Sequence, residues 1–283
     1  MTRIGTVWDS ALEAVRGRAG LIAPIAIGAL FVPNVVQAAT QAYRTTPAAF
    51  VTTGTGLLFG LLSIAILVVT FWGALAITAI TSDPNTTRAD AARAATARLL
   101  PLVGICLVLG FALTLLGLPF ILLLALAGVD FSQMTPGQTP TVSGGTAVLG
   151  FLYMAAFFLL LLWVFARLLP LVPTVLHERL GLRSIGHAFR MTRGLGWRLV
   201  GAVLLYGVVL VVSTLAAQAV FGLVARLLLG ADSIATAQFV GGIAVAAVST
   251  VFSVLSYAFV ARLYVALTGR DHDGLRTGTL AER

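Results

Sequence analysis

Six long apolar stretches constrain this chain more than any other feature of its sequence. A helix rises about 1.5 Å per residue, so about 20 apolar residues suffice to cross the ~30 Å hydrocarbon core of a bilayer. Polar segments separate the stretches, which lie at about 21–41, 56–80, 99–127, 147–169, 199–229 and 234–268. We therefore expect an all-α polytopic membrane protein with six transmembrane helices.

The composition excludes an ordinary water-soluble domain. The 283 residues are 59% hydrophobic and only 10% charged, which leaves too few polar side chains to face water. The single cysteine, Cys106, lies in an apolar stretch and is expected to be a packing residue. His177, His187 and His272 do not pair with other ligands at helical spacing, so we expect no metal site and no cofactor.

The longest polar interruption, residues 177–198, predicts a short amphipathic helix on the membrane surface. Within 184–193, Ile185, Ala188 and Phe189 fall on one face and Arg190 falls on the other. Ser184 is a candidate N-cap. Capping-box spacing also occurs at Thr6/Asp9 and Thr87/Asp90, which predicts two further surface helices. The interfacial anchors that we expect are Trp8, Phe189 and Trp197.

Each of these surface segments precedes two apolar stretches, which predicts three helical hairpins. The hairpins suggest a threefold repeat with boundaries near 5–81, 86–176 and 183–268. Together they form one predicted membrane domain, 1–268, followed by a polar tail at 269–283. The second surface helix is expected over about 87–98, separate from the apolar stretch that follows it.

The arginine distribution predicts the orientation in the membrane. Of the eighteen arginines, only Arg44 and Arg226 fall on the side opposite to the predicted surface helices. By the positive-inside rule, both termini and the tail are cytoplasmic. The chain has arginine but no lysine, a usage that we attribute to a GC-rich bacterial genome, and we expect a multi-pass protein of the bacterial inner membrane. Cleavage after Val36-Gln37-Ala38, as in a signal peptide, is the alternative that remains open.

Two arginines lie inside apolar stretches and are the first candidates for binding a lipid head group. Arg167 and Arg262 stand about 10 and 8 residues before a polar boundary, where they could face the bundle and hold a phosphate bidentately. One alternative is that the long side chains of Arg167 and Arg262 extend along the helix to the membrane–water interface (snorkelling). Another is an ion pair of Arg167 with Glu178. Further head-group candidates in the polar interruption are Arg190, Arg193 and Arg198.

Small residues line one face of the last apolar stretch, as expected where membrane helices approach closely. They are Gly242, Ala246, Ser249 and Ser253, and Gln238 lies on the same face. We expect this face to pack inside the bundle, with a homo-oligomer contact as the alternative.

Three phrases between residues 167 and 198 carry a family resemblance. They are Arg167-Leu-Leu-Pro-Leu-Val-Pro, His177-Glu178, and Ala188-Phe-Arg-Met-Thr-Arg-Gly followed by Trp197-Arg198. With the six-helix layout, they resemble the bacterial membrane-domain family named after glycerophosphodiester phosphodiesterase. In some members, a six-helix membrane domain precedes a soluble phosphodiesterase barrel. These 283 residues hold no such barrel, so the resemblance implies a membrane module and no hydrolysis.

These features predict a non-catalytic inner-membrane module that binds anionic lipid or a partner membrane protein. No basic soluble domain is present to bind nucleic acid. A transporter of lipid or a small amphiphile is the main alternative, and a continuous polar cavity at mid-membrane would favour it. An intramembrane enzyme of lipid metabolism is a third possibility.

Overall fold

The computed structural model describes residues 4–42, 54–126, 144–178, 183–192, 196–230 and 233–269. Within this part of the chain, six helical stretches are long and apolar enough to cross a membrane, as the sequence predicts. They are Ala19–Ala42, Gly56–Ser82, Arg88–Leu122, Gly144–Leu168, Gly196–Leu229 and Ile234–Thr268. Large apolar side chains on them are exposed, among them Leu57 at 75% and Leu228 at 79%. Such faces suit lipid rather than water.

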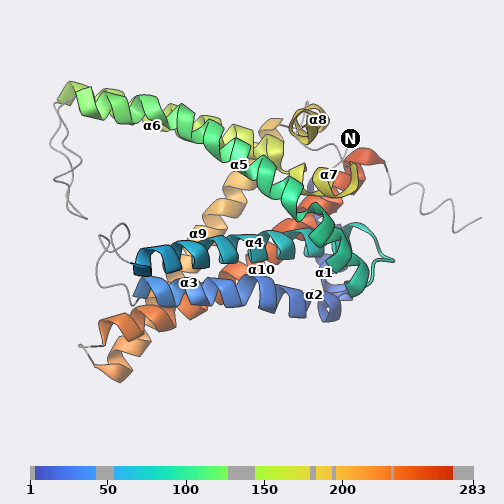
Figure 1. Ribbon diagram of the computed structural model, residues 1–283, viewed down its shortest axis with the longest axis horizontal. Coiled ribbons are helices and arrows are strands. Elements are labelled where there is room, and N and C mark those ends of the chain that lie inside the picture. The colour runs from blue at the N-terminus through green and yellow to red at the C-terminus, as the bar shows by residue number, and fades with distance from the viewer. Residues whose placement is uncertain are drawn as a thin grey trace, which may run out of the picture.

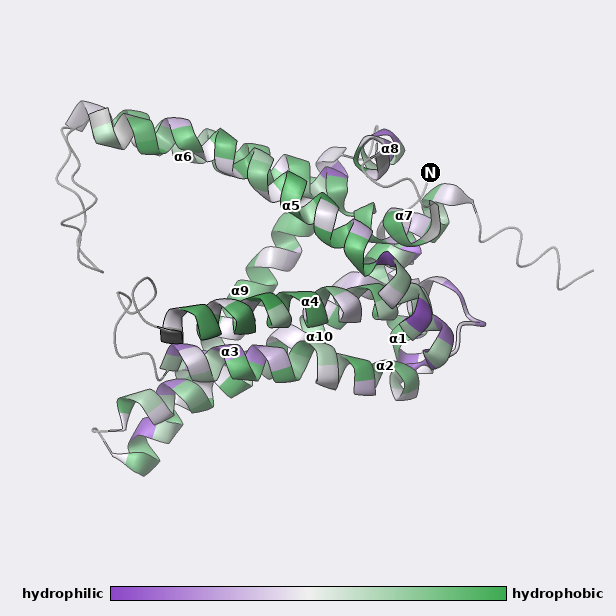
Figure 2. Cartoon of the chain, in the orientation of Figure 1, coloured by the Kyte–Doolittle hydropathy of each residue, from purple (hydrophilic) through white to green (hydrophobic). Residues whose placement is uncertain are grey.

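The helices in chain order are α1 (Ile4–Gly17), α2 (Ala19–Ala26), the π-helical turn η1 (Ile27–Phe31), α3 (Val32–Ala42), α4 (Gly54–Ser82), α5 (Arg88–Leu126), α6 (Gly144–Leu168), α7 (Leu171–Glu178), α8 (Arg183–Met191), α9 (Gly196–Leu229) and α10 (Ile234–Thr268). The short helices α1, α2, α7 and α8 gather at one end of the bundle, and α5 and α6 diverge from α3, α4 and α10 towards the other (Figure 1). Hydrophilic segments are frequent at the end that carries the short helices, which we call the arginine-rich end, and also occur along α3 (Figure 2).

Helix α10 is the centre of the bundle. It packs on α9, α1, α4 and α3, and its last third holds fully buried Leu263 and Tyr264. Val7 and Ala11 of α1 belong to the same apolar cluster as Leu263. The first predicted surface helix therefore docks directly on α10.

A π-helical turn interrupts the first membrane-spanning stretch just before Pro33. Proline has no backbone N–H and its ring crowds the carbonyl four residues earlier, here that of Ala29 within the turn. The wider π turn accommodates this residue. The Ala29 Cβ also lies 2.6 Å from the position that a Cβ on Gly73 would occupy. Only glycine at 73 lets α4 come this close.

Several predicted helix boundaries differ in the structure. The second surface segment is not a separate helix, because α5 runs unbroken from Arg88 to Leu126. Pro101 in its second quarter does not end it, and the ribbon changes direction in this part of the helix (Figure 1). By contrast, the end of α6 at Leu168 agrees with the predicted end near 169, and a turn that includes Pro170 separates α6 from α7.

The predicted caps had mixed outcomes. The Thr87/Asp90 capping box is confirmed: Thr87 Oγ1 donates to Asp90 Oδ2 at 2.6 Å, and the Asp90 backbone N–H donates to Thr87 Oγ1 at 3.3 Å. Thr6 is no cap, since α1 already begins at Ile4. Ser184 is no cap either, because it lies inside α8, fully buried, and its hydroxyl has no hydrogen-bond partner among the described residues.

Arginine side chains tie α4 and α5 to α2 at the arginine-rich end. Arg18 Nη1 donates to the carbonyl oxygens of Ile80 (2.8 Å) and Asp83 (2.9 Å), at the end of α4. Arg88 donates to the carbonyl of Gly20. The last carbonyls of a helix lack intrahelical partners and carry partial negative charge, so a cationic donor stabilises them.

We expect Arg18→Gln to destabilise the protein by about 1–2 kcal/mol, because two charge-assisted hydrogen bonds are lost. For a chain of this size, the melting temperature should fall by roughly 2–4 °C. Thermal unfolding in detergent measures this. Arg16→Gln is the matched control, since it removes the same charge from a neighbouring exposed side chain. Equal melting temperatures for the two variants would contradict the capping role.

Candidate ligand-binding cavity

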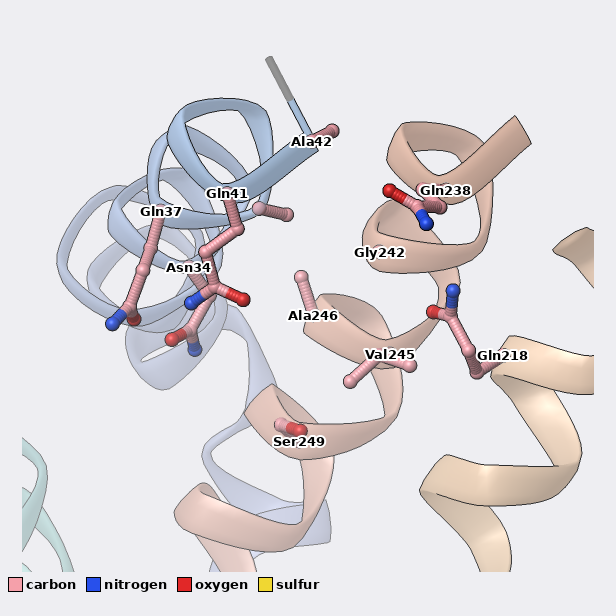
Figure 3. Close-up of a pocket in the computed structure, with 11 residues that line it drawn as sticks. Asn34, Gln37, Gln41, Ala42, Gln218, Gln238, Gly242, Val245, Ala246 and Ser249 are labelled. Carbon is pink, nitrogen blue, oxygen red and sulfur yellow. The ribbon is translucent and has the colours of Figure 1, made fainter. Parts of the chain in front are cut away.

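A cavity of about 480 Å³ lies between α3, α9 and α10, near the end of the bundle opposite the arginine-rich end. Its lining residues are Asn34, Gln37, Ala38, Gln41, Ala42, Gln218, Gln238, Gly242, Val245, Ala246 and Ser249 (Figure 3). The volume falls within the range of small-molecule sites. Ser249 is 15 residues into α10, which corresponds to a depth of about 22 Å along that helix.

Side-chain carboxamides dominate the polar lining. The described part of the chain holds six Asn and Gln residues, and all of them except Asn85 line this cavity. They come from three helices: Asn34, Gln37 and Gln41 from α3, Gln218 from α9, and Gln238 from α10. Polar side chains are costly in a membrane and mark functional cavities there. Their convergence is the strongest chemical signal in the described residues.

The carboxamides are free to bind a ligand. No hydrogen bond among the described residues engages the side-chain amide of Asn34, Gln37, Gln218 or Gln238. Each carboxamide offers two N–H donors and a carbonyl acceptor. Figure 3 shows the amide of Gln41 lying near that of Asn34, and Gln218 and Gln238 pointing towards the same side of α10.

Small residues of α10 form the wall and fix its distance from α3. A Cβ on Gly242 would lie 2.7 Å from the Cβ of Ala38, and one on Gly241 would lie 2.7 Å from Gln218 Nε2. Ala246 on this small-residue face is buried, at 3% exposure. The same face has a second use, because Gly242, Ala246 and Ser249 line the cavity.

A second cavity, of about 250 Å³, lies between α3 and α4. It is lined by Gln37, Thr40, Gln41, Phe59, Leu62, Ser63 and Ile66. Gln37 and Gln41 line both cavities. The Thr40 and Ser63 hydroxyls donate within their own helices, to the carbonyls of Gln37 and Phe59, each at 2.8 Å.

Arg167 lies at the arginine-rich end, where α6, α8 and α9 meet. Its Cζ is 4.8 Å from the centroid of the Trp163 ring, and its Nη1 donates to the carbonyl of Phe189 at 3.3 Å. Its Nε is buried and has no hydrogen-bond partner among the described residues. A Cβ on Gly196, the first residue of α9, would lie 3.3 Å from this Nε. The guanidinium group therefore sits beside a helix N-terminus.

The other predicted site residues are dispersed. Arg262 Nε is also buried without a partner in the described residues, but neither cavity above is lined by Arg262 or Arg167. Arg190 and Arg198 are exposed, and Arg193 lies outside the described residues, as does tail segment 270–283. Ser253 is half-buried on α10.

The three predicted anchors occupy different environments. Trp197 is 83% exposed. The Trp8 ring packs against Phe259, with centroids 5.9 Å apart. The Phe189 ring packs edge-on against Trp163 at 5.8 Å, which places α8 against α6.

Within the described residues, no group of three or more His, Cys, Asp or Glu side chains could hold a metal ion. Comparisons with protein-family models, with curated proteins and with solved structures find no match to this chain. The expected membership of the phosphodiesterase-associated membrane domains therefore stays a prediction from residues 167–198.

Sequence reasoning missed the cavity, although part of its signal was present. Asn34, Gln37 and Gln41 recur at i, i+3 and i+7, the spacing of one helix face. That stripe lies in an apolar stretch whose length is its more conspicuous feature. Gln218 and Gln238 belong to other helices, and nothing local in the sequence pairs them with α3.

Proposed function

We propose that this protein is a membrane module that binds a small amphiphile with a neutral hydrogen-bonding head group. The observation that supports this proposal is the convergence of five carboxamides from three helices on one cavity. Binding of a small amphiphile is thereby favoured over the purely structural or partner-binding module that the sequence also allows.

The chemistry of the lining favours a neutral head group. Among the described residues, no acidic or basic side chain lines the cavity. A charged group would lose its hydration there without a compensating countercharge, at a cost of several kcal/mol. A hydroxylated group, such as a glycerol or a sugar, would exchange its hydrogen bonds with water for bonds to donors and acceptors of the carboxamides.

Native mass spectrometry with two competing single-chain probes tests this proposal. We would equilibrate the protein with equal amounts of 1-oleoylglycerol and 1-oleoyl lysophosphatidic acid, which share a chain and differ in the charge of the head group. Preferential retention of the neutral probe is expected. Exclusive retention of the anionic probe would contradict the proposal.

That contrary result would favour the second candidate function, binding of an anionic lipid at Arg167. The Nε of Arg167 is buried beside the N-terminus of α9 and has no hydrogen-bond partner within the described segments, which supports this candidate. In that case Arg167→Lys should weaken retention of the anionic probe, because lysine keeps the charge but loses the planar fork that binds phosphate bidentately. The neutral probe should be unaffected.

The membrane orientation that we propose places the arginine-rich end and both termini in the cytoplasm of a bacterial cell, so that the carboxamide cavity faces outward. After replacement of Cys106, a cysteine introduced near 137 should react with an impermeant maleimide from outside. Cysteines near 90 and 275 should react only after permeabilisation. External labelling near 90 would reverse the orientation, and a mature N-terminus near Ala39 would show signal-peptide cleavage.

A further inference from the structure

The carboxamide of Gln218 lies face-on against α10 at Gly241. A Cβ on Gly241 would lie 2.7 Å from Gln218 Nε2, 2.8 Å from Cδ and 2.8 Å from Oε1. A point in the plane of the amide group, beyond its nitrogen and oxygen, would be farther from Cδ than from those two atoms. The near-equal distances therefore mean that Gly241 contacts the face of the amide group. Only glycine allows this contact, because Cβ atoms essentially never approach other heavy atoms within 3.0 Å.

This contact leaves the hydrogen-bonding edge of the amide group free. The donors and the acceptor of a carboxamide lie in its plane, and no hydrogen bond among the described residues engages the Gln218 side chain. Figure 3 shows this side chain reaching from α9 towards α10. Gln218 lines the cavity, whereas Gly241 is buried and is not one of the lining residues. Any effect of Gly241 on a ligand must therefore pass through Gln218.

Gly241 also restricts the orientation of the carboxamide. A glutamine side chain has three rotatable bonds, and its terminal torsion is broad when nothing packs against the amide group. Contact of one face with α10 narrows that range, so less side-chain entropy is lost when a ligand binds. A methyl group at position 241 would displace the carboxamide at little cost to the fold, because the displaced atoms are the far end of a flexible side chain.

We propose that Gly241 is a positioning residue for Gln218, and that the positioned carboxamide selects head groups with two adjacent hydroxyl groups. One hydroxyl donates to Oε1 while its neighbour accepts from Nε2, so the acceptor and a donor on the amide edge are both used. A head group with a single hydroxyl satisfies only one of them. This inference rests on the proposed function and narrows its ligand class to vicinal diols, such as the free end of a monoacylglycerol.

Competition between two matched probes tests this inference on the full chain in detergent. 1-Oleoylglycerol has two adjacent hydroxyl groups, and the oleoyl ester of propylene glycol has the same acyl chain and a single hydroxyl. Native mass spectrometry of the wild-type protein with equal amounts of both should show about 2- to 12-fold preferential retention of 1-oleoylglycerol, the effect of one hydrogen bond. Gly241→Ala should remove most of this preference without lowering the melting temperature.

A second glycine beside the same carboxamide provides the matched control. A Cβ on Gly222 would lie 3.9 Å from Gln218 Nε2, an ordinary contact distance, so Gly222→Ala should leave the preference unchanged. Gln218→Ala should abolish the preference, and addition of Gly241→Ala to it should change nothing further, because the glycine acts through this side chain. Gln218→Ala also provides the test if Gly241→Ala does not fold.

The outcomes separate this inference from the proposed function. An unchanged preference in Gly241→Ala or in Gln218→Ala would overturn the inference and leave binding of a neutral amphiphile standing. Equal retention of both probes by the wild-type protein would do the same. If Gly241→Ala lost thermal stability and retained less of both probes in the same ratio, the glycine would only maintain packing, and the positioning role would be wrong. Retention of neither probe by the wild-type protein would overturn both proposals.

Discussion

Replacement of Gln218 and Gln238 together by leucine is expected to reduce retention of 1-oleoylglycerol by about 5- to 150-fold. The reason is the loss of two carboxamides, one from α9 and one from α10, each contributing about 0.5–1.5 kcal/mol to a bound hydroxyl group. Leucine is close to glutamine in size, so the cavity wall should be kept. Native mass spectrometry over a series of probe concentrations measures the change in the apparent dissociation constant.

Asn85→Leu is the matched control for this variant. Asn85 is the only described carboxamide outside the cavity, in the exposed turn between α4 and α5, and there its backbone N–H donates to Asp83 Oδ1. We expect its removal to leave probe retention unchanged. Retention that is undiminished in the double leucine variant would rule out the carboxamide site.

The second large effect, on both stability and probe retention, is expected from a substitution at the contact between α3 and α10. Gly242→Ala places a Cβ 2.7 Å from that of Ala38, closer than nonbonded carbons approach, so one helix must shift. Such overpacking costs about 1–3 kcal/mol. The melting temperature should fall and probe retention should weaken, because the same shift changes the spacing of Asn34 and Gln41 from α10.

Two further variants distinguish this clash from a general effect of removing glycine. Ala38→Gly combined with Gly242→Ala moves the methyl group to the opposite helix and should restore most of the lost stability. Gly201→Ala in α9, where a Cβ would meet nothing within 4 Å, should be neutral or stabilising by up to about 1 kcal/mol. If Gly201→Ala and Gly242→Ala destabilised equally, close packing at Ala38 would not be the cause.

The helices of this protein could be predicted where their causes are local. Apolar length placed the last span at 234–268, the bounds that the structure has. The capping box at Thr87 and Asp90 was also predictable, since a cap needs only residues within one turn. Errors arose where neighbours override local signals: α5 continues through the predicted boundary near Leu99, and Ser184 is buried inside α8.

The candidate site was harder to predict than the helices. Arg167 was singled out because a charge inside an apolar stretch is conspicuous, but its packing on Trp163 and its position beside Gly196 depend on how α6, α8 and α9 meet. The small-residue face of α10 could be predicted as a packing face, because its small residues recur at helical spacing. That the same face also forms a cavity wall depends on the residues of α3 and α9 that lie across the cavity from it.

Sequence alone determined that this chain enters a membrane, because the free energy of transferring an apolar helix into lipid is a sum over its own residues. Tertiary structure alone decided that Asn34, Gln218 and Gln238 share a cavity. Their convergence depends on the close contact of Gly242 with Ala38 and of Gly241 with Gln218. Such contacts are set by shape complementarity between helices far apart in the chain, which hydropathy and periodicity along one helix do not encode.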